Sequence, residues 1–558
     1  MASIVFEQLR FHYQDPYQDV FSGLDLVIET SWRTALVGRN GRGKTTLLRL
    51  IARRLEPADG RLEVPVEARL FPGEPGDPAR ATREVVRRTI APFDDWQGEM
   101  AALAGELADS GSEPPMAAHD GRRAAAAPSV AAPSASSALE RWAELQARFE
   151  AAGGWEVDAR VEREVALLGL DPAILERPFG TLSGGEQTRA LIAALFLTPH
   201  TYALIDEPTN HLDLDGRQVL AEYLAAKDGF LLASHDRALL DACADHTIAI
   251  ERSGVVVLHG GYSAWKRERA RRGESERRRR ATLEREVAKL RRAAHDRRAG
   301  ADRKEREKRG AGDKGFIGHR AAKQMKRAIE IERRVERRIE ERSTLLRDWE
   351  KERTLAFASP SRGTQPLLRV ANGVLRLCGR VLVDRVSFDL PRGSRIVLTG
   401  PNGCGKTRLL DALCGAPLPV PFTIEGLIAL APRAVVTRSF QLPLWRVGLL
   451  RNHLRADSID ETRFRQVLGV LDVEGDLFEH PLETWSEGQR KKADLARTFV
   501  AQQDLVVWDE PMNHLDVLSR ERIEEAILAS LPTMLIVEHD RAFIDRIATE
   551  VIHLGRIA

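Results

Sequence analysis

The sequence has few cysteines and no long apolar run, and both absences narrow the class of protein. Only four cysteines occur in 558 residues, and none forms a C-x-x-C pair. This excludes a disulfide framework and a cysteine zinc site. No stretch approaches the 18 apolar residues of a membrane-spanning helix, and the first residues do not resemble a secretory signal. We therefore expect a soluble, cytoplasmic protein that is not itself a membrane pump.

The net charge of +2 conceals one strongly basic segment. Residues 261–350 contain 31 Lys and Arg against 17 Asp and Glu, so this segment carries +14 and the remainder of the chain −12. A solvated coiled coil would also be rich in charge. An excess of this size favours a polyanionic partner such as nucleic acid.

The length predicts several domains, and two motifs occur twice in the same order. Residues 34–46 read TALVGRNGRGKTT, and residues 395–407 read RIVLTGPNGCGKT. Residues 203–213 read ALIDEPTNHLD, and residues 506–516 read VVWDEPMNHLD. A short apolar run within or before each motif is typical of a buried parallel strand. Each half is therefore predicted to be an α/β unit with phosphate chemistry at the carboxyl ends of its strands.

Both halves contain G-x-x-x-x-G-K-[ST], the pattern of a phosphate-binding loop. Its glycines let backbone N–H groups surround the phosphates, its lysine neutralises the β and γ groups, and its threonine offers a hydroxyl to Mg²⁺. One match could be a chance glycine turn, but two matches after apolar strands exclude this. The predicted ATP-binding residues of these loops are Gly38, Asn40, Gly41, Gly43, Lys44, Thr45 and Thr46, and Gly400, Asn402, Gly403, Gly405, Lys406 and Thr407.

An Asp-Glu pair ends a predicted strand in each half, and a histidine follows a further apolar strand in a matching H-D-R sequence. The aspartate can hold hydrated Mg²⁺, the glutamate can polarise the attacking water, and the imidazole can contact the γ-phosphate. The glutamates could instead only cap the next helix, but the repeated context favours chemistry. The predicted catalytic residues are Glu207, Glu510, His235 and His539. The predicted Mg²⁺ ligands are Thr45, Asp206, Thr407, Asp509 and Gln441.

Residues 181–190 read TLSGGEQTRA, which resembles the signature of ABC proteins. In that family the serine and glycine amides begin a helix and bind the γ-phosphate of ATP held by the opposite cassette. The second half reads WSEGQRKKA at residues 485–493, with Glu487 in place of the first glycine. A carboxylate there should weaken ATP binding at the Lys44 site unless it points away. The predicted signature contacts are Ser183, Gly184, Gly185, Glu186, Ser486, Gly488 and Gln489.

The two sites are predicted to be unequal. Tyr13 is the expected adenine-stacking residue of the first half, whereas the equivalent stretch of the second half ends in Cys378. Gln441 is the expected Mg²⁺-sensing glutamine of the second half, and Gly73 stands at that place in the first. Alternating roles for the two ATP molecules are therefore expected rather than equivalent ones.

Together, DEPTNHLD, DEPMNHLD, the absence of membrane spans and a charged helical linker resemble the ABC-F family. The resemblance implies an ATPase that uses ATP and Mg²⁺ and binds the ribosome, at rRNA and tRNA near the exit site and the peptidyl-transferase centre. The function would be that of a housekeeping translation factor or of a protein that protects the ribosome from drugs. An exporter ATPase subunit is an alternative of another class, but it leaves the basic linker unexplained.

Residues 313–328, DKGFIGHRAAKQMKRA, are similar to the linker of the antibiotic-resistance branch of that family, which protects against lincosamide, streptogramin A and pleuromutilin drugs. The predicted linker tip comprises Lys314, Phe316 and Ile317, and its apolar side chains could contact bases or tRNA. Local packing of these side chains is the simpler alternative.

The predicted fold class is α/β, with two P-loop ABC-type nucleotide-binding domains joined by an antiparallel α-helical coiled-coil linker. The predicted domains are 1–260 for the first cassette, with a disordered Ala- and Pro-rich insertion at about 105–138, 261–355 for the linker and 366–558 for the second cassette. Helices at 263–297 and 319–353 would form the coiled coil, with a turn within 298–318. The two cassettes are expected to pair within one monomer.

Overall fold

The computed structural model describes residues 2–14, 17–73, 76–109, 133–251, 254–308, 355–357, 365–473 and 475–555. The chain divides into two compact units, Met1–Ser263 with Leu355–Ala558, and Ala264–Thr354. Both cassettes therefore belong to one unit, and most of the linker forms the other. Within the described ranges, no helix combines the length and the apolar character that crossing a membrane requires.

The first cassette is built on a six-stranded sheet in the order β5-β6-β7-β3-β8-β9, parallel except for β9. Its strands are β3 (Arg33–Gly38), β5 (Glu67–Phe71), β6 (Thr201–Asp206), β7 (Phe230–Ala233), β8 (His246–Glu251) and β9 (Gly254–His259). The phosphate loop follows β3, and the Asp-Glu pair lies at the end of β6. His235 follows β7, and β7 lies between β3 and β6 in the sheet. The strand order therefore brings the three motifs to one edge of the sheet.

The second cassette repeats this plan with a five-stranded parallel sheet in the order β14-β15-β16-β12-β17. Its strands are β12 (Arg395–Thr399), β14 (Val436–Ser439), β15 (Leu505–Asp509), β16 (Met534–Val537) and β17 (Glu550–His553). Again the strand that precedes the histidine, β16, lies between two motif strands. These are β12, which precedes the phosphate loop, and β15, which ends at the Asp-Glu pair. The predicted α/β fold with two nucleotide-binding domains is confirmed.

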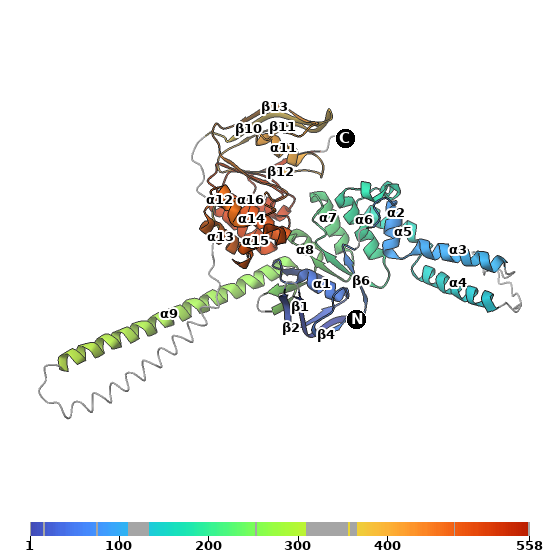
Figure 1. Ribbon diagram of the computed structural model, residues 1–558, viewed down its shortest axis with the longest axis horizontal. Helices are drawn as coiled ribbons and strands as arrows, with labels where there is room; N and C mark the ends of the chain where they lie inside the picture. The colour runs from blue at the N-terminus through green and yellow to red at the C-terminus, as the bar shows by residue number, and fades with distance from the viewer. Residues whose placement is uncertain are drawn as a thin grey trace, which may run out of the picture. The chain divides into compact units, whose positions relative to one another are not determined.

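A three-stranded antiparallel sheet accompanies each parallel sheet. The strands are β1 (Ser3–Gln14), β2 (Tyr17–Glu29) and β4 (Asp59–Glu63), and β10 (Leu368–Leu377), β11 (Arg380–Leu390) and β13 (Phe422–Leu430). The helix after each phosphate loop, α1 (Lys44–Ile51) or α11 (Lys406–Leu413), fills the space between the two sheets, as Figure 1 shows for α11. Apolar residues such as Leu47 and Leu409 are fully buried there. This packing fixes the start of the helix, where phosphates bind.

Further helices complete both cassettes and carry the signatures. In the first cassette they are α2 (Thr82–Ile90), α5 (Val157–Leu167), α6 (Gly184–Leu197), α7 (Leu214–Ala225) and α8 (Arg237–Cys243). In the second they are α12 (Leu450–Ala456), α13 (Glu461–Val470), α14 (Glu487–Val500), α15 (Val517–Ser530) and α16 (Arg541–Ile547). Helices α6 and α14 begin within the two signatures, as predicted.

Two helices border the Ala- and Pro-rich segment, which was predicted to be disordered over residues 105–138. Helix α3 (Phe93–Asp109) extends into this range from one side, and α4 (Pro133–Ala151) begins within it on the other. Phe93 and Phe149 join the helices with ring centroids 5.6 Å apart. Alanine favours helices and proline is tolerated in a first turn, which explains both ends. Residues 110–132 lie outside the described residues.

Helix α9 (Tyr262–Lys308) forms the described part of the linker. It is longer than the predicted helix at 263–297 and continues into the range assigned to the turn. Pairs of opposite charge one turn apart support it, including Glu268 with Arg272 at 3.2 Å. The second predicted helix at 319–353 and the tip residues Lys314, Phe316 and Ile317 lie outside the described residues, so the coiled coil stays a prediction.

Candidate functional site

The first phosphate loop curls around the ammonium group of Lys44. Lys44 Nζ donates to the carbonyl of Gly38 at 2.9 Å and lies 3.4 Å from Asn40 Oδ1. Burial lowers the pKa of Lys44, and the charge of Glu207 opposes this effect. Gly43 adopts φ 95°, and a Cβ atom there would lie 2.5 Å from Val20, so only glycine fits this turn.

Acidic residues and a histidine meet Lys44 and Thr45 at one cavity. Thr45 Oγ1 donates to Asp206 Oδ2 at 2.7 Å, and the His235 backbone N–H donates to Glu207 Oε2 at 3.3 Å. The Nε2 atom of His235 lies 3.3 Å from Glu207 Oε1. The cavity has a volume of about 250 Å³. Its lining consists of Tyr13, Gln18, Val20, Asn40, Gly41, Gly43, Lys44, Thr45, Thr46, Asp206, Glu207 and His235.

Burial dominates the acid-base properties of this cavity. It raises the pKa of Glu207 to about 7 and also raises the pKa of Asp206. It lowers the pKa of His235 well below its usual value, so this imidazole is neutral at physiological pH. A neutral histidine beside a glutamate that titrates near neutral pH is an arrangement suited to proton transfer.

Tyr13, the expected adenine-stacking residue, lines the cavity of the first site. Its hydroxyl is 3.1 Å from Thr46 Oγ1, and its ring packs edge-on against Phe11 with centroids 5.1 Å apart. Cys378, in the equivalent stretch of the second cassette, is exposed and adopts φ 49°. The side chain offered to a base is therefore a ring in one cassette and a thiol in the other.

The second phosphate loop holds its lysine in the same way but arranges its glutamate differently. Lys406 Nζ donates to the carbonyls of Gly400 and Pro401, each at 2.9 Å. Glu510 Oε2 accepts from Gln441 Nε2 at 3.1 Å and from Asn513 Nδ2 at 2.7 Å. Gln441 thus lies at the glutamate, and sequence reasoning missed Asn513 although it belongs to the repeated N-H-L-D motif.

Two further side chains of the second cassette are buried without well-oriented hydrogen bonds among the described residues. Neither carboxylate oxygen of Asp509 has a well-oriented hydrogen-bond donor among the described residues, and burial together with Glu510 raises its pKa. Both ring nitrogens of His539 also lack partners within this part of the chain, and burial lowers its pKa to about 3. Thr407 follows Lys406 at the start of α11. Arg438 Nη2 lies 3.8 Å from Asp509 Oδ2. A buried carboxylate without well-oriented hydrogen bonds fits a bound cation.

Each phosphate loop touches the acidic-motif loop of the other cassette. Asn40 Nδ2 donates to the carbonyl of His514 at 2.9 Å, and Asn402 Nδ2 donates to that of His211 at 3.0 Å. The backbone N–H of Asn402 also lies 3.3 Å from Asp213 Oδ2. The two cassettes therefore meet face to face within one chain. We define the first site by the phosphate loop of the first cassette and the second site by that of the second.

The second signature lies against the first phosphate loop. A Cβ atom added to Gly488 would come within 3.2 Å of Asn40 Nδ2 and 2.6 Å of the His514 carbonyl. This is the cross-paired arrangement that the sequence predicts. At the start of each signature helix, Ser183 and Ser486 are N-caps.

The signature side chains that were predicted to contact ATP serve partly as helix caps. Glu186 accepts from the backbone N–H of Ser183 at 2.7 Å, and Gln489 accepts from that of Ser486 at 2.8 Å. Both serines accept the reciprocal bond, which completes two capping boxes. Gly184 and Gly185 occupy the first turn of α6, with amides free to face a ligand.

Glu487 is not among the residues that line the cavity of the first site. Its side chain is 69% exposed, and Oε2 lies 3.7 Å from His514 Nδ1. At the first position of α14 its charge is favourable to the helix dipole. The weakened ATP binding that the sequence suggests at the first site stays a prediction.

Comparison with known proteins identifies the family of the two cassettes. The sequence model of the ABC transporter family matches residues 21–210 and 383–513, which is more than half of the chain and covers both cassettes. The chain therefore belongs to the ABC family. Its ATP-binding domains define an enzyme that binds and hydrolyses ATP.

Similar proteins are known from several organisms. The ATP-binding protein Uup of Caulobacter vibrioides is 30% identical over 559 residues, covering 97% of this chain and 75% of Uup. ABC transporter F family member 5 of Arabidopsis thaliana is 26% identical, with 96% and 73% coverage. The energy-dependent translational throttle protein EttA of Mycobacterium tuberculosis is 27% identical over 429 residues, with 74% and 70% coverage.

A solved structure shares the fold. The archaeal ribosome recycling factor aABCE1, in complex with the ribosomal stalk protein aP1, matches with a TM-score of 0.52 and 19% identity, covering 98% of this chain and 87% of that chain.

Proposed function

We propose that this chain is an ABC-F ATPase that binds the ribosome through its basic linker in the ATP-bound state and leaves after hydrolysis. The observation that carries the proposal is the double contact of Asn40 and Asn402 with the opposite cassette. One chain thus supplies both halves of both sites, and ATP between them would hold the cassettes together. The relative EttA, named as a translational throttle, supports the ribosome as partner.

The residues at each site suit ATP hydrolysis. Lys44 and Lys406 would neutralise the phosphates, and the signature amides would bind the γ-phosphate from the other side. Glu207 and Glu510 would accept the proton of the attacking water. Mg²⁺, held by the threonine of each phosphate loop and its aspartate, would stabilise the charge on the leaving phosphate. No group of three or more His, Cys, Asp or Glu suited to a metal occurs in the described ranges, which agrees with an ion held mainly by phosphates and water.

The linker has the charge that binding to ribosomal RNA requires. With a charge of +14 over residues 261–350, it is suited to the phosphates of ribosomal RNA. Helix α9 begins at Tyr262, whose hydroxyl donates to Glu521 on α15 at 2.8 Å. The basic helix therefore starts at a residue bonded to the second cassette, so closure of the cassettes can change its direction.

A trapped variant tests ribosome binding. Glu207→Gln with Glu510→Gln should bind ATP without hydrolysing it, so the protein should remain on 70S ribosomes and pellet with them through a sucrose cushion. The matched control is the same variant with Lys44→Ala and Lys406→Ala, which should stay in the supernatant. A trapped form that binds ATP normally but does not pellet would refute the ribosome as partner.

More specifically, we propose that the chain protects the ribosome from lincosamide, streptogramin A or pleuromutilin drugs at the peptidyl-transferase region. A housekeeping role in translation is the equal alternative. Expression in a drug-susceptible host separates them. Protection predicts raised tolerance that is lost on deletion of residues 305–318 while ATPase activity is retained. Unchanged tolerance with the full chain would leave the housekeeping role.

A further inference from the structure

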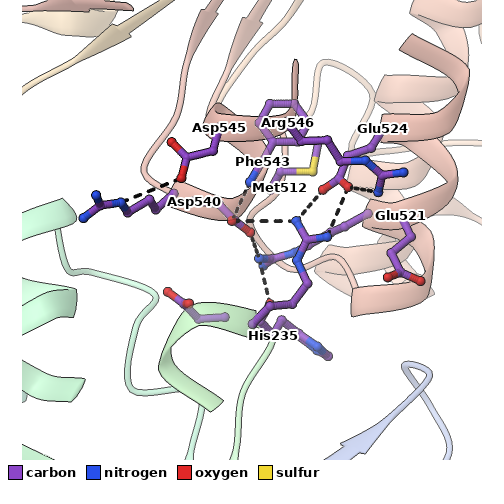
Figure 2. A network of polar contacts seen from close by, with 12 residues as sticks. His235, Met512, Glu521, Glu524, Asp540, Phe543, Asp545 and Arg546 are labelled. Atoms are coloured by element: carbon purple, nitrogen blue, oxygen red, sulfur yellow. Dashed lines mark hydrogen bonds and ion pairs between the residues drawn. The ribbon is translucent and has the colours of Figure 1, made fainter. Parts of the chain in front are cut away.

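A buried ion cluster joins the two cassettes beside His235 (Figure 2). Arg237 begins α8 of the first cassette, and its guanidinium binds the carboxylate of Glu524 on α15 of the second, with Nη1 3.1 Å from Oε2. Glu524 also accepts from Arg546 Nη1 at 2.6 Å. Arg237 is 6% exposed and Glu524 is fully buried, so water screens this pair little.

Arg520 extends the cluster to the backbone of His235. Its Nη1 atom donates to the His235 carbonyl at 3.0 Å and to Asp540 Oδ2 at 2.8 Å, and its Nε atom donates to the Leu515 carbonyl at 3.1 Å. Asp540 is itself held as the N-cap of α16. Arg520 therefore ties the peptide of His235 to two loops of the second cassette.

The corresponding helix of the first cassette lacks the central carboxylate. Counted from the shared N-H-L-D sequence, Ala221 stands where the second cassette has Glu524, and Arg217 stands where it has Arg520. The hydrogen bonds of Arg217 in the described part of the chain stay within the first cassette, at Leu212 and Asp236, although its charge also lowers the pKa of His539 in the second cassette. Among the described residues, therefore, no hydrogen bond from α7 to the second cassette corresponds to the bond from Arg520 to the His235 carbonyl.

The arginines that follow the two histidines also differ between the cassettes. Arg541 is the counterpart of Arg237 in the H-D-R sequence of the second cassette. Its side chain is 70% exposed and lies 3.8 Å from Asp545 of its own helix. The cross-cassette ion pair thus exists beside His235 and has no counterpart beside His539 within the described residues.

The two histidines reflect this difference. His235 Nε2 lies 3.1 Å from Asn40 Oδ1 and 3.3 Å from Glu207 Oε1, whereas both ring nitrogens of His539 lack partners among the described residues. The histidine whose backbone is held by the other cassette is the one engaged with its phosphate loop and its glutamate.

We propose that Arg520 and the Arg237–Glu524 pair are positioning residues for hydrolysis at the first site, supplied in large part by the opposite cassette, and that the second site works without them. The inference rests on the proposed roles of Glu207 and His235. Its consequence is that turnover at the first site requires this interface to be closed.

Site-specific backgrounds make the inference testable. In the full chain, Glu510→Gln leaves the first site as the active one, and Glu207→Gln leaves the second. Arg237→Ala should lower kcat at the first site by about ten-fold or more, because displacement of a catalytic group by less than 1 Å is costly. It should change kcat at the second site less than two-fold, and the KM for ATP less than two-fold in either background.

Arg541→Ala is the matched control, because this exposed counterpart should leave both sites unchanged within two-fold. Arg237→Ala leaves Glu524 paired with Arg546, so a buried charge is not orphaned. Should it still unfold, Arg237→Met with Glu524→Leu removes both charges and should show the same selective loss.

The outcomes separate this inference from the proposed function. Equal losses at both sites, a change in KM alone, or no loss at the first site would overturn the positioning role. If Glu207→Gln with Glu510→Gln still hydrolyses ATP at the wild-type rate, the assignment of the glutamates fails first. Loss of activity in that double variant together with the selective effect of Arg237→Ala supports both.

Discussion

The two ATP sites share their phosphate loops and differ in nearly everything around the glutamate. At the first site, Glu207 faces His235 and a cavity lined by Tyr13. At the second, Glu510 is held by Gln441 and Asn513. Two side-chain amides orient Glu510, whereas burial raises the pKa of Glu207. The comparison shows how a duplicated domain can keep its motifs while its copies acquire different chemistry.

The largest expected effect comes from removing one glutamate at a time. Glu510→Gln should abolish most steady-state ATP turnover, by about 100-fold at the second site, because the general base is lost. Glu207→Gln should remove the smaller share, since Gly73 leaves the first site without a counterpart of Gln441. Phosphate release measured for both single variants and the double variant checks this. Equal losses of ATP turnover in the two single variants would contradict the proposed difference between the two sites.

An exchange of the glutamine sharpens the same comparison. Gln441→Gly should lower turnover at the second site by about ten-fold, the typical cost of a misplaced catalytic group. Gly73→Gln should raise turnover at the first site a few-fold, because the nearest atom to an added Cβ is 3.9 Å away. Single-turnover ATP hydrolysis in the Glu510→Gln background measures the gain, and the unchanged glycine chain is its control. A fall in rate after Gly73→Gln would contradict the assignment.

The smallest effect concerns stability and pH. Burial raises the pKa of Glu207 from 4.5 to about 7, so the folded protein binds more protons than the unfolded chain between these values. The stability from this group is full below about pH 4.5 and is lost as the pH rises through 7. Glu207→Gln should therefore stabilise the ATP-free protein at pH 7.5 by about 1–3 kcal/mol and not at pH 4.5. The exposed fifth of the side chain favours the lower figure.

Urea unfolding of wild type and Glu207→Gln at both pH values measures this difference. A gain that is the same at both pH values would show that packing, and not ionisation, is responsible.

Short motifs predicted the sites because their chemistry depends on neighbouring residues. Lys44 and Thr45 are consecutive, and one strand end supplies Asp206 and Glu207. Strand order then brings separate motifs together, which the general rule for parallel sheets anticipates. The fold class and the four motif-bearing strands could therefore be read directly from the sequence.

Contacts between distant positions could not be predicted in the same way. Arg237 and Glu524 are 287 positions apart, and neither belongs to a phosphate-binding pattern. The only signal of this contact in the sequence is the repeated H-D-R motif, in which a role was predicted for the histidine and none for the arginine. Likewise, the alanines bordering residues 110–132 suggested low complexity, although alanine is also the strongest helix former. Composition alone does not separate these two readings.

The length of α9 determines how far its far end moves when the helix changes direction at its start. A straight helix of 47 residues is about 70 Å long, so a rotation of about 10° at Tyr262 would sweep its other end through about 12 Å. Tyr262 is bonded to α15, the helix that also carries Glu524 and Arg520. A change in direction at the first residue of α9 that is too small to disturb the sheets would therefore become a large displacement at the far end of the helix.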